Sequence, residues 1–182
     1  MSFIKTELEG VLVFEPRVFP DDWGHFFESY NKNTFIEAGL KYDFVQDNQS
    51  KSSYGVLRGL HYQLEPHAQT KLVRVLQGKI LDVVVDIRRE SNTYGKWIAT
   101  ELSGDEFKQL LVPKGFAHGF VVLSDIAVVS YKCDSFYNKE AEGGIRFDDP
   151  ELKIDWKVPH KDINISEKDR VLPFFKDAKN NF

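Results

Sequence analysis

Sulfur-containing residues and long apolar runs are scarce in this sequence. It holds one cysteine, Cys133, and one methionine among 182 residues, so an intramolecular disulfide is impossible. No stretch approaches the roughly 20 consecutive apolar residues that a membrane helix needs. The first ten residues lack the continuous apolar run of a signal peptide. We therefore expect a protein of the reducing cytoplasm, with no membrane partner.

Basic residues are not in excess either. The chain has 24 Lys and Arg against 28 Asp and Glu, which gives a net charge of -4. A nucleic-acid-binding protein usually shows a basic face. Glycine-rich phosphate loops and dinucleotide fingerprints are also absent, which disfavours a dehydrogenase. We expect no nucleic-acid partner and no nicotinamide cofactor.

Helix signals are few, whereas strand signals are frequent. About ten short apolar or aromatic segments follow one another with tight turns, and the helices that a parallel βαβ sheet requires are missing. Aromatic residues, which favour strands, make up 14% of the chain. We predict an all-β sandwich or barrel, formed as a single domain by residues 1–182. The expected strands include 10–15, 25–30, 56–62, 71–77, 80–87, 97–103, 109–112, 117–123 and 126–131.

Turn and cap residues predict three further details. A short helix is expected over residues 33–40, with Asn33 or Thr34 as its cap and Gly39 at its end. The Gly78-Lys79 turn joins two apolar runs, 72–76 and 80–85, and this pattern is typical of a hairpin. The tail over residues 148–182 is charged, contains three prolines and has only scattered large apolar residues. We expect it to wrap around the barrel as extended or short helical segments.

The segment 55–63 contains an arginine and a histidine that a glycine separates. In a regular strand Arg58 and His61 point to opposite faces, because side chains alternate. Gly59 between them is costly inside a strand unless the strand bends or bulges there. With a bulge, Arg58 and His61 can share one pocket. Without one, the pattern describes an exposed arginine and a core histidine.

Three other polar residues stand in predicted strands, and each has two interpretations. Lys71 is either a solvated edge charge or a cation in a site. His118 lies between two small residues, which leave room beside its ring, although a hydrogen-bonded core histidine gives the same pattern. Tyr131 is either a core residue with a paired hydroxyl or a general acid that can protonate an enolate.

A metal site is a further possibility that the histidines raise. His61, His67 and His118 could supply three imidazoles, as in many metal-binding β-barrels. The sequence has no His-x-His pair with a following carboxylate at the spacing that such barrels use. We therefore expect no metal ion.

Taken together, these segments resemble the dTDP-4-dehydrorhamnose 3,5-epimerase family. The most specific segment is Leu57-Arg58-Gly59-Leu60-His61-Tyr62-Gln63, and segments 24–28, 46–48, 113–120 and 166–169 occur in the expected order. The resemblance implies a cupin-like jelly roll that needs no cofactor, and a homodimer in which N-terminal strands are exchanged. It also implies a dTDP-sugar substrate: dTDP-4-dehydro-6-deoxy-glucose would be converted to dTDP-4-dehydro-L-rhamnose, on the route to dTDP-L-rhamnose.

The resemblance also implies roles for individual residues. His61 would be the base, oriented by Asp169, while Tyr131 would donate a proton on the opposite face and Lys71 would stabilise the enolate oxygen. The residues expected to bind the substrate are Phe26 (from the partner subunit), Glu28, Gln46, Asn48, Arg58, His118, Tyr137, Glu142 and Arg170.

One position departs from the family pattern, and three other functions stay open. Trp23 stands where the family usually carries an arginine that reaches the nucleotide across the dimer. The alternatives are an epimerase that inverts one carbon, a non-catalytic cupin-like module that binds sugar nucleotides, and a metal-dependent cupin enzyme. Tyr131 favours inversion of both carbons, because it equips the second face for proton delivery.

Overall fold

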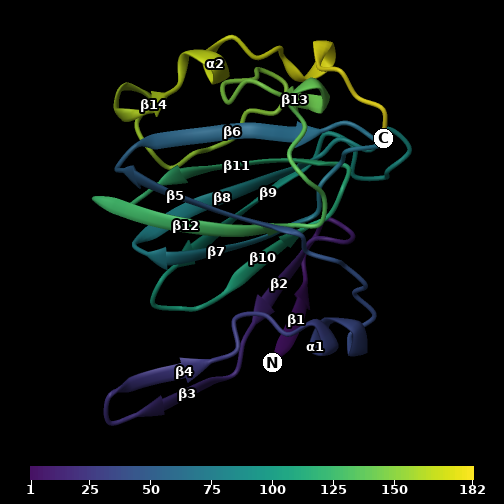
Figure 1. Ribbon diagram of the computed structural model, residues 1–182. Coiled ribbons are helices and arrows are strands. Elements are labelled where there is room, and N and C mark those ends of the chain that lie inside the picture. The colour runs from purple at the N-terminus through teal and green to yellow at the C-terminus, as the bar shows by residue number, and fades with distance from the viewer.

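Two facing β-sheets form the body of the protein, as a computed structural model of residues 1–182 shows (Figure 1). The first sheet has the order β1 (Ser2–Lys5), β2 (Leu12–Glu15), β10 (Gln109–Val112), β7 (Lys71–Gln77), β12 (Ile126–Cys133) and β5 (Gln46–Ser53). The second has the order β13 (Glu142–Gly144), β6 (Val56–Gln63), β11 (Phe116–Val122), β8 (Lys79–Asp86) and β9 (Trp97–Ser103), and β14 (Asn164–Ile165) adds to β6 in parallel. The prediction of an all-β sandwich is confirmed.

Consecutive strands mostly lie in different sheets. The predicted hairpin between residues 72–76 and 80–85 is therefore wrong: β7 pairs with β10 and β12, whereas β8 pairs with β9 and β11. Gly78, whose φ is +77°, turns the chain from one sheet to the other where a Cβ atom would collide with the backbone of Ile126. Both strands are apolar because both are covered, so the sequence pattern alone cannot tell a crossing from a hairpin.

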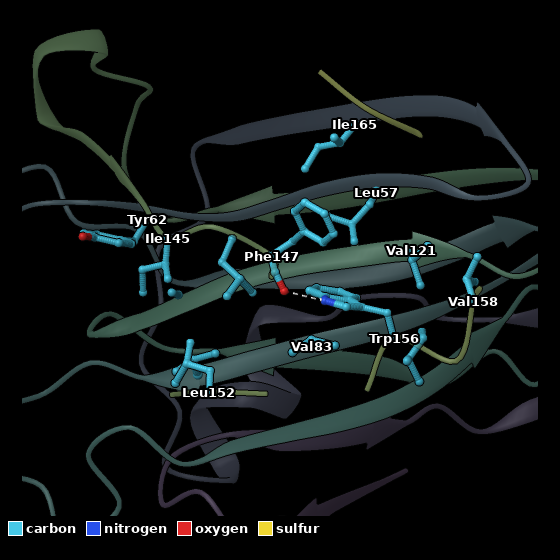
Figure 2. Packing of buried hydrophobic residues seen from close by; sticks show 14 of the residues in the cluster. Leu57, Tyr62, Val83, Val121, Ile145, Phe147, Leu152, Trp156, Val158 and Ile165 are labelled. Carbon is cyan, nitrogen blue, oxygen red and sulfur yellow. Dashed lines mark hydrogen bonds between the residues drawn. The ribbon is translucent and has the colours of Figure 1, made fainter. Parts of the chain in front are cut away.

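The second sheet is buried on both faces. Its inner face packs against the first sheet through residues such as Val84 and Val122. Its outer face packs against the tail, where Trp156 donates from Nε1 to the carbonyl oxygen of Phe147 at 2.8 Å (Figure 2). The predicted wrap of residues 148–182 is thus confirmed. It includes β14, the short helix α2 (Glu167–Arg170) and one-turn 3₁₀ segments at His160–Asp162 and Phe175–Asp177.

The first sheet is covered by a short helix, α1 (Lys32–Glu37), which buries Phe35 against Phe14 and Leu72. The predicted cap is wrong by two to three residues. Asn31 caps the helix, because its side chain accepts from the backbone N–H groups of Asn33 and Thr34. Gly39 follows the end of the helix with a φ of +81°, as predicted.

A two-stranded hairpin, β3 (Val18–Asp21) and β4 (Gly24–Phe27), projects away from both sheets (Figure 1). The prediction had no strand over β3 and placed one over residues 25–30, so the first strand of the hairpin was missed and the second ends earlier than predicted. Trp23 at the tip is 94% exposed, and Phe26 is 65% exposed. Nothing in the single chain covers these aromatic rings. No helix anywhere in the chain has the length and apolar character to cross a membrane.

Candidate active site

A bulge in β6 shapes the candidate site. His61 lies opposite His118 on β11, but Arg58 lies opposite Phe120, so β6 has one residue more than β11 between these two pairs. Gly59 occupies the bulge with a φ of +122°, and a Cβ atom there would lie 2.6 Å from the Cα of Gly119. The bulge breaks the alternation of the strand. Arg58 and His61 consequently line the same cavity, as the sequence predicted for a bulged strand.

Two adjoining cavities open between the sheets at this edge of the sandwich, with volumes of about 670 and 460 Å³. They share His61, Lys71, Tyr131 and Lys168, so they form one continuous cleft. The inner part is lined by Arg58, His118 and Asp169 among others. The outer part is lined by Gln46, Asn48, Tyr137 and Glu142 among others.

His61 and Asp169 form a hydrogen-bonded pair at the wall of the cleft. Nε2 of His61 lies 2.7 Å from Oδ1 of Asp169, and Oδ2 accepts from the backbone N–H of Gly59 at 3.3 Å. Burial would raise the pKa of Asp169, but the hydrogen bond and charge of His61 outweigh it and lower that pKa. Ser166 fixes the carboxylate-bearing turn, because its Oγ accepts from the backbone N–H of Asp169 at 3.1 Å. An ionised Asp169 therefore orients the His61 ring.

Lys71 and Tyr131 enter the cleft from the first sheet, opposite the His61 wall. Burial lowers the pKa of Lys71, and no carboxylate lies within ion-pair distance of its ammonium. Burial raises the pKa of Tyr131, which the charge of Arg58 partly offsets. Tyr131 therefore keeps its proton at neutral pH, ready for donation.

His118 belongs to a second histidine–carboxylate pair, which sequence analysis missed. Its Nε2 lies 2.9 Å from both carboxylate oxygens of Asp82, a fully buried residue of β8. A charged residue in the otherwise apolar run 80–85 was the signal that could have revealed it. His118 lines the inner cavity, where its ring is buried and its Nε2 is occupied by Asp82.

The outer rim of the cleft holds a second residue that sequence analysis did not assign. Lys168 donates to Glu142 at 2.6 Å, and this bond raises the pKa of Lys168. Burial opposes ionisation of Glu142, but Lys168 and Tyr137 outweigh it and lower its pKa. The rim thus presents a fixed ion pair beside the exposed ring of Tyr137.

Three predicted binding residues lie away from the cleft within one chain. Phe26 and Glu28 are on or beside the projecting hairpin, and neither lines a cavity of the cleft. Arg170 is exposed, lies 3.7 Å from Glu167 and donates to the carbonyl oxygen of Ile165. No group of three or more His, Cys, Asp and Glu residues is placed to hold a metal ion.

Comparisons with known proteins give a consistent result. The family model for dTDP-4-dehydrorhamnose 3,5-epimerase matches residues 5–177. A dTDP-4-dehydrorhamnose 3,5-epimerase of Shigella flexneri is 55% identical over 170 residues, covering 90% of this chain and 94% of that protein. The crystal structure of the same enzyme from Elizabethkingia anophelis has a TM-score of 0.95 at 56% identity, covering 100% of this chain and 99% of that one.

A relative crystallised with a ligand has the same fold. The dTDP-6-deoxy-D-glucose-3,5-epimerase of Legionella pneumophila, in complex with dTDP-4-keto-L-rhamnose, has a TM-score of 0.92 at 43% identity and covers 97% of this chain and 93% of that one. These likenesses confirm the cupin-like jelly roll. The chain belongs to the dTDP-4-dehydrorhamnose 3,5-epimerase family and is an isomerase.

Proposed function

We propose that this protein converts dTDP-4-dehydro-6-deoxy-α-D-glucose to dTDP-4-dehydro-β-L-rhamnose by inverting carbons 3 and 5, with no metal or other cofactor. One observation supports this most strongly. His61, held by Asp169, and Tyr131 enter a single cleft from opposite sheets, and Lys71 lies in the same cleft. An epimerase needs this arrangement, because a proton must leave one face of a carbon and arrive on the other.

The keto group at carbon 4 makes the hydrogens on carbons 3 and 5 acidic. Because Nε2 of His61 donates to Asp169, Nδ1 carries the free lone pair and acts as the base. The electron pair of the broken C–H bond moves onto the keto oxygen, and the Lys71 ammonium stabilises this enolate. Tyr131 then gives its hydroxyl proton to the opposite face of the same carbon. The same steps then occur at the second carbon, after His61 and Tyr131 have recovered their original protonation states.

Binding of the nucleotide is proposed for the outer cleft, with the diphosphate where the outer part meets the inner part. Arg58 and Lys168 offer cations to the diphosphate, and the exposed Tyr137 ring offers a stacking surface to the thymine. Glu142 and Gln46 line the same space. Lys168 replaces Arg170 in this proposal, because Lys168 lines the cleft and Arg170 does not.

We also propose a homodimer, in which the β3–β4 hairpin of each subunit lies on the other. The support is the projection of this hairpin and the exposure of Trp23 and Phe26, which a partner would cover (Figure 1). Trp23, Phe26 and Glu28 would then approach the outer cleft of the partner. Light scattering should give a mass of twice 21.0 kDa. A monomer would refute the exchange.

Residues 1–182 act as one domain in this proposal, because the tail packs on the second sheet.

The reaction can be tested by proton NMR in deuterated water with no metal added. The purified protein and dTDP-4-dehydro-6-deoxy-glucose should show deuterium entering both carbons 3 and 5. Exchange at one carbon would identify a single-carbon epimerase. Absence of exchange, with binding of dTDP retained, would identify a binding protein and refute the proposal.

A further inference from the structure

A chain of side-chain hydrogen bonds runs along one wall of the cleft. The backbone N–H of Tyr137 donates to Oε1 of Gln46 at 3.0 Å, and Nε2 of Gln46 donates to Oδ1 of Asn48 at 3.1 Å. Nδ2 of Asn48 then donates to Sγ of Cys133 at 3.7 Å, a normal reach for the larger sulfur atom. The chain thus leads from the exposed rim at Tyr137 to a fully buried thiol.

The hydrogen bond at Tyr137 determines which group donates and which accepts in every other hydrogen bond of this chain. The backbone N–H of Tyr137 can only donate, so Gln46 must turn its oxygen toward it and its amino group toward Asn48. Asn48 must in turn offer its oxygen to Gln46 and its amino group to Cys133. Cys133 therefore receives a hydrogen bond as an acceptor, and each of the two amides keeps only one N–H group for any other partner.

Cys133 ends the chain beside Lys71. The two residues are direct partners across β7 and β12, and Cys133 is also the direct partner of Gln46 across β12 and β5. Directly opposed residues of antiparallel strands have side chains on the same face, so Cys133 and Lys71 lie together on the cleft side of the sheet. Burial raises the pKa of the thiol, which keeps Cys133 neutral next to the ammonium.

We propose that Cys133 is a positioning residue for Lys71, and that Gln46 and Asn48 couple it to the nucleotide-binding rim at Tyr137. The role of Lys71 in this inference rests on the proposed function. The thiol fills the space beside Lys71 and offers it a polar atom without a negative charge. A carboxylate in this place would hold the ammonium in an ion pair and draw it away from the enolate oxygen.

The first test compares two substitutions of one residue. Cys133→Ala removes the acceptor of the Asn48 N–H group and the polar atom beside Lys71, so the pKa of Lys71 falls further. The kcat should fall about 5- to 10-fold, the worth of one hydrogen bond, with KM changed less than about 2-fold. The alkaline fall in kcat should also begin at a lower pH. Cys133→Ser keeps an acceptor and should restore both quantities.

Other charged groups also face Lys71, and the comparison holds them constant. Neither substitution at position 133 alters the ionisable residues that line the inner cleft or lie beneath it: Arg58, His61, Asp82, His118, Tyr131, Lys168 and Asp169. Wild-type kcat and pH profile in Cys133→Ala would overturn the inference. Equal loss in the Ala and Ser variants would also overturn it, because a polar atom at position 133 would then not be what Lys71 requires.

The second test needs no turnover and so separates this inference from the proposed reaction. Nitrogen-15 spectra record the side-chain amides of Gln46 and Asn48, which Gln46→Leu and Asn48→Leu variants identify by the loss of each signal. Cys133→Ala should shift the Asn48 and Gln46 amide signals together, and Cys133→Ser should shift them less. A Gln46 signal that does not respond to Cys133→Ala would overturn the coupled chain, even if the enzyme epimerises the proposed substrate.

Discussion

Two histidine–carboxylate pairs flank the same cleft, and they differ mainly in burial. His61 and His118 are direct partners across β6 and β11, and each bonds an aspartate through Nε2. The side chain of His61 is 39% exposed, whereas that of His118 is 8% exposed. Asp169 comes from the tail, whereas Asp82 comes from the adjacent strand β8. The two pairs thus contain the same chemical groups but lie in different surroundings.

This difference assigns the two pairs to different tasks. An exposed imidazole can meet a substrate carbon and exchange protons, while its carboxylate holds the ring in place. A buried pair cannot reach the substrate freely, and removal of one partner leaves an uncompensated polar group in the interior. We therefore expect loss of activity from changes in the His61–Asp169 pair, and loss of stability from changes in the His118–Asp82 pair.

The largest effect is expected from His61→Asn. Without its general base, the enzyme should lose about 10²- to 10⁴-fold in kcat, because a positioned base contributes that much. Binding of dTDP, measured by calorimetry, should remain, since the base lies apart from the proposed nucleotide contacts. His118→Asn is the matched control, with a greater loss of thermal stability and a smaller loss of turnover. Near-wild-type kcat in the His61 variant would refute the assignment of the two pairs.

The next effect concerns stability and tests the buried pair. Asp82→Ala leaves Nε2 of His118 without its partner in a closed environment, so the free energy of unfolding should fall by about 3 kcal/mol. Asp169→Ala should lower it less, because the exposed His61 ring can bind water instead. Urea denaturation of both variants measures the contrast. Equal destabilisation would show that burial does not separate the pairs.

The sequence predicted part of this contrast and missed the rest, for physical reasons. His61, Lys71 and Tyr131 stand in recognisable strands, and Gly59 marked the bulge. Asp169 lies 108 residues from His61, so only the resemblance to a family could link them before the structure did. The passages of the chain from one sheet to the other were not predictable. Strands that are buried on both faces lack the alternation of apolar and polar side chains that helps to identify a hairpin.

The pH dependence of activity is the third prediction, and it concerns Lys71 between the two pairs. Burial lowers the pKa of Lys71 from 10.5, and the neighbouring Cys133 and Asp82 partly oppose this. As pH rises, Lys71 should lose its proton earlier than an ordinary lysine, whereas the raised pKa of Tyr131 keeps that group protonated. The fall in kcat at alkaline pH is therefore expected to result from deprotonation of Lys71.

Asp82→Asn removes a charge that favours the Lys71 ammonium, and so it should move this alkaline fall to lower pH. Lys71→Arg should move it to higher pH with a maximal rate about 10-fold lower, since a guanidinium stays charged but fits the site differently. Rate profiles between about pH 7 and pH 10 measure both shifts. An unchanged profile in Lys71→Arg would assign the alkaline fall to another group.

The smallest effect is the dependence of stability on pH that the His61–Asp169 pair should cause. The folded-state pKa of Asp169 is lowered, so its ionised form stabilises the fold. This stabilisation is complete above the ordinary aspartate pKa of 3.8 and is lost as pH falls through the lower folded-state value. The Asp169→Asn variant lacks this pH-dependent stabilisation. The wild type should therefore be more stable than the variant by on the order of 1 kcal/mol at neutral pH, and the two should converge in acid. A constant difference from neutral to acidic pH would mean that the carboxylate charge stabilises nothing, and that Asp169 acts on His61 through hydrogen-bond geometry alone.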